Sequence, residues 1–484
     1  MSVKKKFSSD YAGVNKSESS AMLLSEDLEE TAEDTPGHFR SDKYEESGEV
    51  APPNTCCYAL SSPIKFVGKQ FKQGGVNGSI FSLITAILGS GTITLPYLAY
   101  NNGIAMAAIL IIFGAILSYF CGMLLVSCAA KVGSDKYEDM AAFCFGRKMV
   151  LVTGWSNVST LLGFVVSYIV FLKTLIPHIL IVLFGEKNIP GILSNGRYTG
   201  QIFWATIYTF LILTPLSMPR KIGALRFNSM FGVCCSFYLV MCIVFMFFFD
   251  RTLVPDIGEA FKKARYFNVT LDGMVDAIPF VVFAFMYQPN IPIIYRELTT
   301  KTYGKMNKIV TIGSSFVVVL YILAASFGYL GLVGNDDMLA TLAEKNNILE
   351  VLYPSAAFKV AIIGLVFAIF AAAPVCVLPA KDAFEEIVFA NGKMTMKWNV
   401  ITTIIMCIIC YVCAIVIPGI GDVITILGCT TNPLIGFILP IVFYLKIVEN
   451  IPTWKKFCCW MVLIFIIAVS IASFALFIKD KIKG

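Results

Sequence analysis

Two clusters of helix-breaking residues lie inside long apolar stretches of the sequence. Gly89-Ser90-Gly91 falls within residues 78–100, and Gln288-Pro289 falls within residues 272–295. Glycine weakens a helix, and proline removes an amide donor while it pushes the preceding residue away from helical angles. An interrupted helix offers free amides that attract a carboxylate and free carbonyls that attract an ammonium group. A site that combines both suits a small zwitterion.

Each cluster also has a plainer interpretation. Small residues let membrane helices pack closely, and a single proline often does no more than kink a helix. The two clusters, however, occupy matching places, because each opens a set of five apolar stretches. Such a match is typical of transporters built from two inverted repeats, with the binding site between the repeats at the bilayer midplane.

The composition places these stretches in lipid. The chain has 484 residues, of which 57% are hydrophobic and 14% are charged, and its mean hydropathy is +0.76. Soluble domains carry about 25% charged residues. A helix crosses a membrane with about 20 apolar residues, and eleven such stretches are predicted, near residues 78–100, 103–130, 149–180, 199–217, 222–249, 272–295, 309–334, 355–380, 398–417, 422–445 and 457–478.

The predicted fold is therefore an all-α polytopic membrane protein with 11 transmembrane helices. Two inverted repeats of five helices are expected over about 78–249 and 272–445, with helices 1 and 6 broken and an extra helix at 457–478. The net charge of +6 comes largely from basic residues between the apolar stretches and predicts no nucleic-acid partner. Most of these basic residues fall on the side of the N-terminus, which predicts a cytosolic N-terminus.

Residues 1–75 differ from the remainder, residues 76–484, which we predict to be the transmembrane domain. The first segment is polar and carries an acidic run from Ser25 to Asp34, so it cannot bury a core and is predicted to be a disordered cytosolic tail. Such a tail could carry sorting signals or recruit a signalling protein. The second possibility leaves an amino acid sensor as the alternative function.

Other function classes fit poorly. The chain has two histidines, His38 and His178, and no cluster of nucleophile, base or metal-binding groups, so we predict neither an enzyme nor a cofactor or metal site. No Asp, Glu, Lys or His is expected in the middle of a span, where such residues mark ion pathways. Asn268-Val-Thr270 is a candidate glycosylation site whose occupancy the sequence leaves open.

At the two interruptions the chain resembles the amino acid/auxin permease family of eukaryotic amino acid transporters, which includes sodium-coupled neutral and lysosomal proton-assisted carriers. The matching stretches are Gly89-Ser-Gly-Thr-Ile-Thr-Leu-Pro96 and Phe283-Ala-Phe-Met-Tyr-Gln-Pro-Asn-Ile-Pro-Ile-Ile-Tyr-Arg-Glu-Leu298. The resemblance implies a LeuT-type fold, alternating access around a central amino acid, and a plasma-membrane or lysosomal (vacuolar) location. It also implies these substrate-binding residues: Thr85, Ala86, Gly89, Ser90, Gly91, Thr92, Phe283, Ala284, Phe285, Tyr287 and Gln288.

Within that set the resemblance implies different roles. Gly89, Ser90 and Gly91 would hold the carboxylate, and carbonyls near Ala86 and in 283–285 would hold the amine. Tyr287 and Gln288 would shape the pocket. Because no acidic residue is evident deep in the pocket and Phe164, Phe283, Phe285 and Tyr287 are aromatic, we expect a neutral substrate.

The sequence departs from the sodium-coupled members of the family at two positions. Thr85 stands where those members have Asn, and Ala372 stands where they have a hydroxyl in span eight. We therefore expect transport that does not use the usual sodium site. Asp276, near the outer end of span six, is the candidate for a coupling proton, although a solvated acid at a helix end is the commoner explanation. Facilitated exchange without a coupling ion remains open.

Overall fold

The computed structural model describes residues 75–185, 188–193, 200–219, 226–351, 355–389 and 394–483. The ordered elements in these ranges are helices, with no strand among them. The predicted cytosolic tail, apart from Gly75, lies outside the described residues, and so does residue 484. An all-helical architecture is what the apolar stretches predict.

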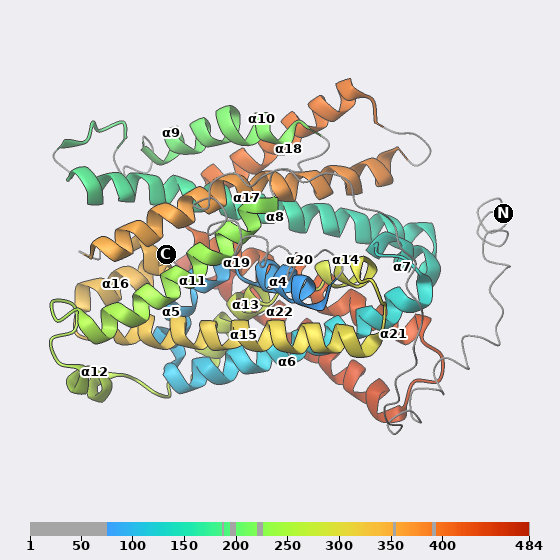
Figure 1. Ribbon diagram of the computed structural model, residues 1–484, viewed down its shortest axis with the longest axis horizontal. Helices are drawn as coiled ribbons and strands as arrows, with labels where there is room; N and C mark the ends of the chain where they lie inside the picture. Colours follow the sequence, from blue (N-terminus) through green and yellow to red (C-terminus); the bar gives the residue numbers. More distant parts are fainter. Residues whose placement is uncertain are drawn as a thin grey trace, which may run out of the picture. The chain divides into compact units, whose positions relative to one another are not determined.

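Long helices run side by side through the molecule (Figure 1). Eight of them, within the described residues, are long and apolar enough to cross a membrane, or up to ten spans if each of two bent pairs counts as one. The long helices are α6 Ile104–Val132, α8 Arg147–Phe184, α11 Arg226–Phe249, α15 Tyr303–Leu330, α17 Ala356–Val388, α18 Met396–Val416, α22 Thr453–Lys483, and a continuous run formed by α9 Gly200–Ile207, the π-helical turn η3 Tyr208–Leu213 and α10 Thr214–Ser217. These helices make the chain a polytopic membrane protein.

The two bent pairs fall in predicted spans one and ten. The first consists of α4 Val76–Ile87, the 3₁₀ turn η1 Ser90–Ile93 and α5 Leu95–Asn102, with a bend of 54°. The second, bent by 41°, consists of α19 Ile420–Cys429, α20 Thr431–Pro433, the π-helical turn η6 Leu434–Ile438 and α21 Leu439–Ile447. The second bend is not among the interruptions predicted from the sequence. It arises at Thr430, whose φ of −115° and ψ of −88° leave the helical region.

Predicted span six is divided as well. It comprises α13 Leu271–Ala284 and α14 Asn290–Glu297, with residues 285–289 between the two helices. Neither piece alone has the length of a span. The remaining helices are short connecting elements that the sequence analysis did not predict: α7 Tyr137–Phe145, α12 Ile257–Lys263, α16 Asp336–Lys345 and the 3₁₀ turn η5 Ile348–Glu350.

Side-chain caps explain why two of these connecting helices begin where they do. The Asp256 carboxylate accepts hydrogen bonds from the amides of Gly258 and Glu259 at the start of α12. The Asn335 side chain accepts from the amide of Met338 at the start of α16. Each cap satisfies amides that have no acceptor inside the helix.

The helices form two sets whose members contact one another. One set contains α8, the α9–α10 run, α17 and α18, and the other contains α4, α6, α13 and α15. Within the first set α8 and α17 are antiparallel, because Trp155 near the start of α8 packs on Phe384 near the end of α17, with ring centroids 5.9 Å apart. The outer faces of the long helices expose large apolar side chains, Ile116 and Ile464 among them, as expected for contact with lipid.

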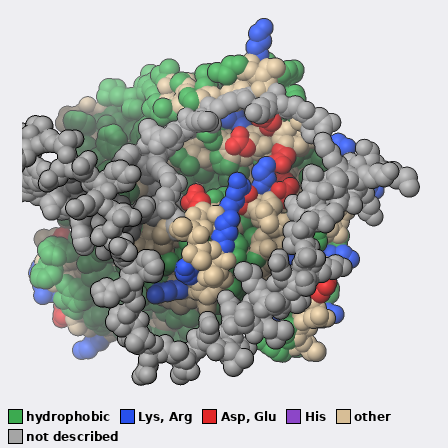
Figure 2. All heavy atoms as spheres, turned by 45° about the vertical axis from the view of Figure 1, so that its right-hand side comes forward, with side chains coloured by type: hydrophobic (Ala, Val, Ile, Leu, Met, Phe, Trp, Pro, Cys, Tyr) green, Lys and Arg blue, Asp and Glu red, His purple; other side chains and the backbone are tan. Residues whose placement is uncertain are grey.

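Ion pairs join several elements at one end of the helices. Lys136, just before α7, pairs with Glu386 of α17 at 3.0 Å, and the neighbouring Asp135 pairs with Arg296 of α14. Figure 2 shows Lys, Arg, Asp and Glu side chains gathered at this end. Because these side chains are largely exposed, such pairs contribute little stability, about 0–1 kcal/mol each.

A partly buried acid lies in the connection between α15 and α17. The carboxylate of Glu350, in η5, accepts a hydrogen bond from the Asn347 side-chain amide at 3.1 Å and lies beside the Thr174 hydroxyl. Burial raises the pKa of Glu350 above its ordinary value, although these hydrogen bonds partly oppose the rise. The folded protein therefore holds a proton here at pH values where the unfolded chain releases it.

The raised pKa predicts a pH dependence of stability. The contribution of Glu350 is fully present below its ordinary pKa, about 4.3, and is lost as the pH rises through the raised pKa. Glu350→Gln should therefore flatten the fall in Tm between about pH 4.3 and neutral pH, measured by thermal unfolding in detergent. Glu449→Gln, at an exposed position outside this connection, is the control and should leave the slope unchanged. An equal slope for Glu350→Gln and the wild type would contradict the prediction.

Candidate functional site

The first interruption lies between α4 and η1. The helix ends at Ile87, and Leu88 and Gly89 have extended backbone angles before η1 begins at Ser90. The amide of Leu88 still donates to Ile84 O at 2.8 Å, which closes the last turn of α4. A Cβ added to Gly89 would meet no atom within 4 Å, so this glycine faces open space.

The second interruption follows α13. Phe285 leaves the helical region with φ of −108° and ψ of 26°. The amides that follow form tight turns instead of helical bonds: Met286 N donates to Phe283 O at 3.3 Å and Tyr287 N donates to Phe285 O at 3.1 Å. Helical geometry returns at Asn290, directly after Pro289, because proline fits the beginning of a helix.

The ends of α4 and α13 meet at one side chain. The hydroxyl of Tyr321, from α15, lies 2.8 Å from Ile87 O and 3.2 Å from Ala284 O, and the tyrosine is fully buried. These carbonyls belong to the last residues of the two interrupted helices. A hydroxyl has one hydrogen to donate and each carbonyl has two lone pairs. The two carbonyl oxygens thus retain lone pairs that can accept further hydrogen bonds where the helices end.

The backbones of the two interruptions also approach each other closely. A Cβ added to Gly91 would lie 2.9 Å from Cα and 3.0 Å from Cβ of Ala284. Only a glycine lets η1 come this near to the end of α13. Thr92, fully buried on the same turn, lies beside the Tyr321 hydroxyl. Four residues from three elements are therefore brought together: Gly91, Thr92, Ala284 and Tyr321.

The aromatic side chains of the second interruption point in two directions. The ring of Phe283 packs edge-on against Phe164 of α8, with centroids 5.6 Å apart. Phe285 and Tyr287 are fully buried and lie against α6, at Gly114 and Gly122 respectively. Phe285 and Tyr287 thus position the interruption, whereas Phe283 lies between the two helix sets.

Two buried carboxamides lie at or near the second interruption without hydrogen-bond partners among the described residues. Gln288 and Asn432 are both fully buried, and both atoms of each amide lack a partner. A Cβ added to Gly436, one turn beyond Asn432, would lie 3.3 Å from the Gln288 Oε1 atom. Buried amides in native proteins are almost always satisfied. Such groups mark a place for a polar group of a ligand or for water.

The remaining predicted residues lie apart from this contact. Thr85 donates its hydroxyl to Phe81 O, at 2.9 Å in its own helix, and Ala86 is partly buried beside it on α4. The backbone of Ser90 opens η1, but its side chain lies outside the described residues. Ala372 lies halfway along α17. None of these positions adds a charged group.

Asp276 joins one helical piece of each interrupted stretch, α5 and α13. One carboxylate oxygen accepts from the Tyr97 hydroxyl at 2.9 Å and from the Asn101 side-chain amide at 3.3 Å. Tyr97 and Asn101 belong to α5 and Asp276 to α13, so the carboxylate links these two helices. Asp276 is therefore held by neighbours rather than freely solvated.

Sequence reasoning missed Tyr321 and Asn432. Tyr321 is a single tyrosine inside the apolar stretch 309–334, and nothing in its local pattern sets it apart. Asn432 carried a signal, since Thr430-Thr431-Asn432-Pro433 is a polar run inside the apolar stretch 422–445. Polar residues at membrane depth mark functional or structural sites more often than a proline alone does.

The helices and the paired interruptions define a polytopic helical membrane protein of the transporter class. The chain belongs to the family of transmembrane amino acid transporter proteins, the amino acid/auxin permease family, whose model matches residues 72–480. It is similar to the sodium-coupled neutral amino acid symporter 2 of Danio rerio, with 27% identity over 428 residues that cover 84% of this chain and 82% of that protein.

A solved structure has the same fold. The crystal structure of MhsT in complex with L-phenylalanine matches with a TM-score of 0.57 at 14% sequence identity, over 82% of this chain and 98% of that chain. At this identity the likeness shows the fold alone. It confirms the LeuT-type architecture that the family resemblance implies.

The contact at Tyr321 predicts a loss of function without a loss of fold. Tyr321→Phe removes the hydroxyl between the ends of α4 and α13, and leaving a buried carbonyl unpaired should raise the KM for an amino acid by about threefold to tenfold. Tyr238→Phe is the matched control, because it also removes a hydroxyl that donates to a carbonyl, Ala357 O, but at an exposed position. Equal KM values for the two variants, measured by uptake, would count against a role for the contact.

The close approach of η1 to α13 predicts that even one methyl group is too large. Gly91→Ala would force η1 away from Ala284, and such overpacking should lower uptake about tenfold or more. Gly304→Ala adds the same methyl group where no atom lies within 4 Å and should transport normally. Normal uptake by Gly91→Ala, at matched membrane expression, would show that the interruptions need not touch.

Proposed function

We propose that this protein is a secondary transporter of neutral amino acids that works by alternating access. The amino acid would lie between the two interruptions, with its carboxylate at the amides of Gly89, Ser90 and Gly91. Its ammonium group would lie at the carbonyls that end α4 and α13. The observation that carries the proposal is the meeting of these two helix ends at Tyr321. One place thus offers donors for the carboxylate and acceptors for the ammonium group of a zwitterion.

The proposal includes the transmembrane count and the topology. Taken together as one broken span, α13 and α14 would be the sixth of eleven, and spans 1–5 and 6–10 would be inverted repeats. The cluster of ion pairs around Lys136 and Arg296 would then face the cytosol, as would the N-terminal tail. Sorting or signalling proteins are the expected partners of that tail.

A neutral substrate is favoured by the side chains around the interruptions. Phe164 and Phe283 supply an apolar wall, and Gln288 and Asn432 supply uncharged hydrogen-bonding groups. A cationic or anionic side chain in this surrounding would lack a counter-charge. The related proteins, a neutral amino acid symporter and MhsT in complex with L-phenylalanine, fit the same class.

We further propose that transport does not use the usual sodium site, in contrast to the name of the Danio rerio relative. The Thr85 hydroxyl bonds within its own helix, and Ala372 has no side-chain oxygen to offer. Sodium prefers several oxygen ligands, so the loss of such donors weakens the site. A coupling proton would be carried by Asp276, which links α5 and α13.

Purified protein in liposomes tests this function directly. A panel of neutral, cationic and anionic amino acids is supplied under separate sodium and pH gradients. We expect uptake of neutral amino acids that persists when sodium is replaced by choline and that an inward proton gradient accelerates. Collapse of uptake in choline would overturn the sodium proposal, and the absence of uptake for all amino acids would overturn the proposed function itself.

A further inference from the structure

Two lysines are buried inside long helices of the same helix set. Lys173 of α8 and Lys381 of α17 are each 3% exposed. Lys173 lies inside predicted span 149–180, and Lys381 lies one residue beyond predicted span 355–380. A buried ammonium group is costly unless its donors find acceptors, so the partners of these two side chains matter.

Each lysine caps the end of a neighbouring helix. Lys173 Nζ donates to Ala414 O and Ile417 O, both at 2.6 Å, at the end of α18. Lys381 Nζ donates to Ser217 O at 2.6 Å, at the end of α10. The last carbonyls of a helix have no donor within the helix and carry the negative end of its dipole. An ammonium group donates hydrogen bonds to these carbonyls, and its positive charge interacts favourably with the helix dipole.

The two caps are reciprocal. Counted in the proposed spans, α8 is the third span of the first half and caps α18, the fourth of the second half. In the same way α17, the third span of the second half, caps the α9–α10 run, the fourth of the first half. Lys173 also follows the first residue of α8 at nearly the same spacing as Lys381 follows the first residue of α17. This correspondence is independent of the interruptions at Gly89–Gly91 and at residues 285–289.

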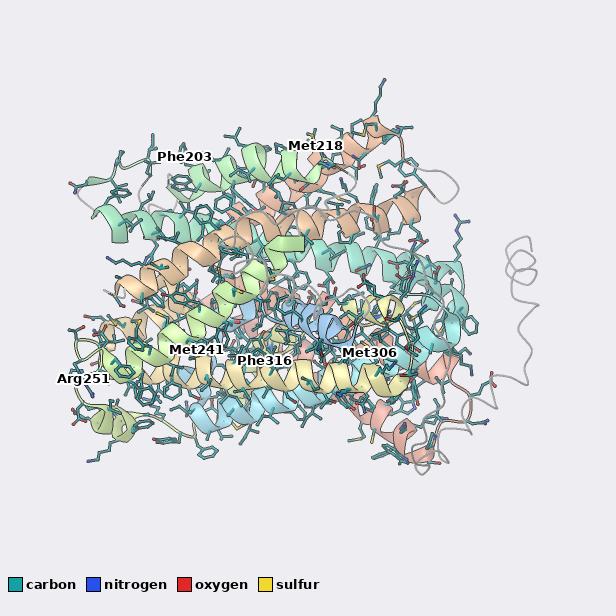
Figure 3. The ribbon with its side chains drawn as sticks, viewed as in Figure 1. Phe203, Met218, Met241, Arg251, Met306 and Phe316 are labelled. Atoms are coloured by element: carbon teal, nitrogen blue, oxygen red, sulfur yellow. The ribbon has the colours of Figure 1, made fainter. Side chains whose placement is uncertain are left out.

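The caps lie toward opposite ends of the helix set. Because α8 and α17 are antiparallel, lysines late in each helix lie far apart along the pair. Met218, which follows the capped residue of α10 and is labelled in Figure 3, accepts a further bond from Asn399 of α18 at 2.9 Å. Each end of the set formed by α8, α9–α10, α17 and α18 thus contains one lysine cap.

We propose that Lys173 and Lys381 are positioning residues that fix this set as a frame at both membrane faces. The substrate cradle is formed by other elements, namely α4, η1, α13 and α15. Neither lysine acts on the substrate. Each acts through the helix end that it caps, and the pair holds the geometry on which turnover depends.

Hydrogen exchange tests the caps without any assumption about transport. In Lys173→Met, deuterium uptake should rise in peptides from the last turns of α18 and not at the end of α10. In Lys381→Met, the pattern should be reversed. Lys173→Arg and Lys381→Arg, which keep a charged donor, should restore protection, and Lys262→Met and Lys301→Met, at exposed positions, should change neither end.

A second test measures transport, and it rests on the proposed transport activity. Turnover per folded molecule should fall about tenfold in each Met variant, since a charge-assisted bond to a buried acceptor is lost, while the KM stays within about twofold because neither lysine belongs to the cradle. A merely structural role would lower protein yield and Tm but not turnover per folded molecule. Should a Met variant fail to fold, the Gln variant, which keeps an uncharged donor, carries the same comparison.

Two results would overturn the proposal. One is deuterium uptake that rises equally at both helix ends in either variant, or at neither. The other is turnover equal to that of the exposed-lysine controls. Failure of the proposed function is distinguishable, because a protein that moves no amino acid would still give a clear answer by hydrogen exchange.

Discussion

Within a membrane every backbone amide and carbonyl needs a partner, and this requirement governs the structure around the interruptions. Water is absent from the hydrocarbon core, so a broken helix persists only where protein groups or a ligand replace the missing bonds. At the ends of α4 and α13 the replacement is the Tyr321 hydroxyl, which lies within hydrogen-bonding distance of both terminal carbonyls. Gly91 permits the two backbones to approach, and the remaining donors and acceptors are left for a zwitterion.

The same requirement explains where charge occurs in the apolar interior. Lys173 and Lys381 lie where neighbouring helices end, so each ammonium group donates to carbonyls that have no donor within their own helix. Asp276 is placed where a tyrosine hydroxyl and an asparagine amide can donate to it. The two buried lysines therefore lie against helix ends, where the backbone itself is polar.

Much of the fold could be predicted from residue patterns, and the limits of the prediction have physical causes. Each of the eleven predicted stretches contains helical segments, because apolar length is a local property of the sequence. The Gly-rich and Pro-containing clusters likewise indicate helix interruptions from the local sequence alone. Tyr321 and Lys173 could not be assigned this way, since their partners are backbone carbonyls of helices distant in sequence. No glycine or proline lies at the centre of the bend at Thr430. Within its own stretch, only the polar run through Asn432 indicates this bend.

The reciprocal lysines bear on how such a protein can evolve. Each lysine donates to a helix in a distant part of the chain, Lys173 to α18 and Lys381 to α10, so a fragment without that helix would lose these hydrogen bonds. Substitutions at either lysine and at the helix end that it caps are therefore expected to be coupled, although the two lie far apart in the sequence.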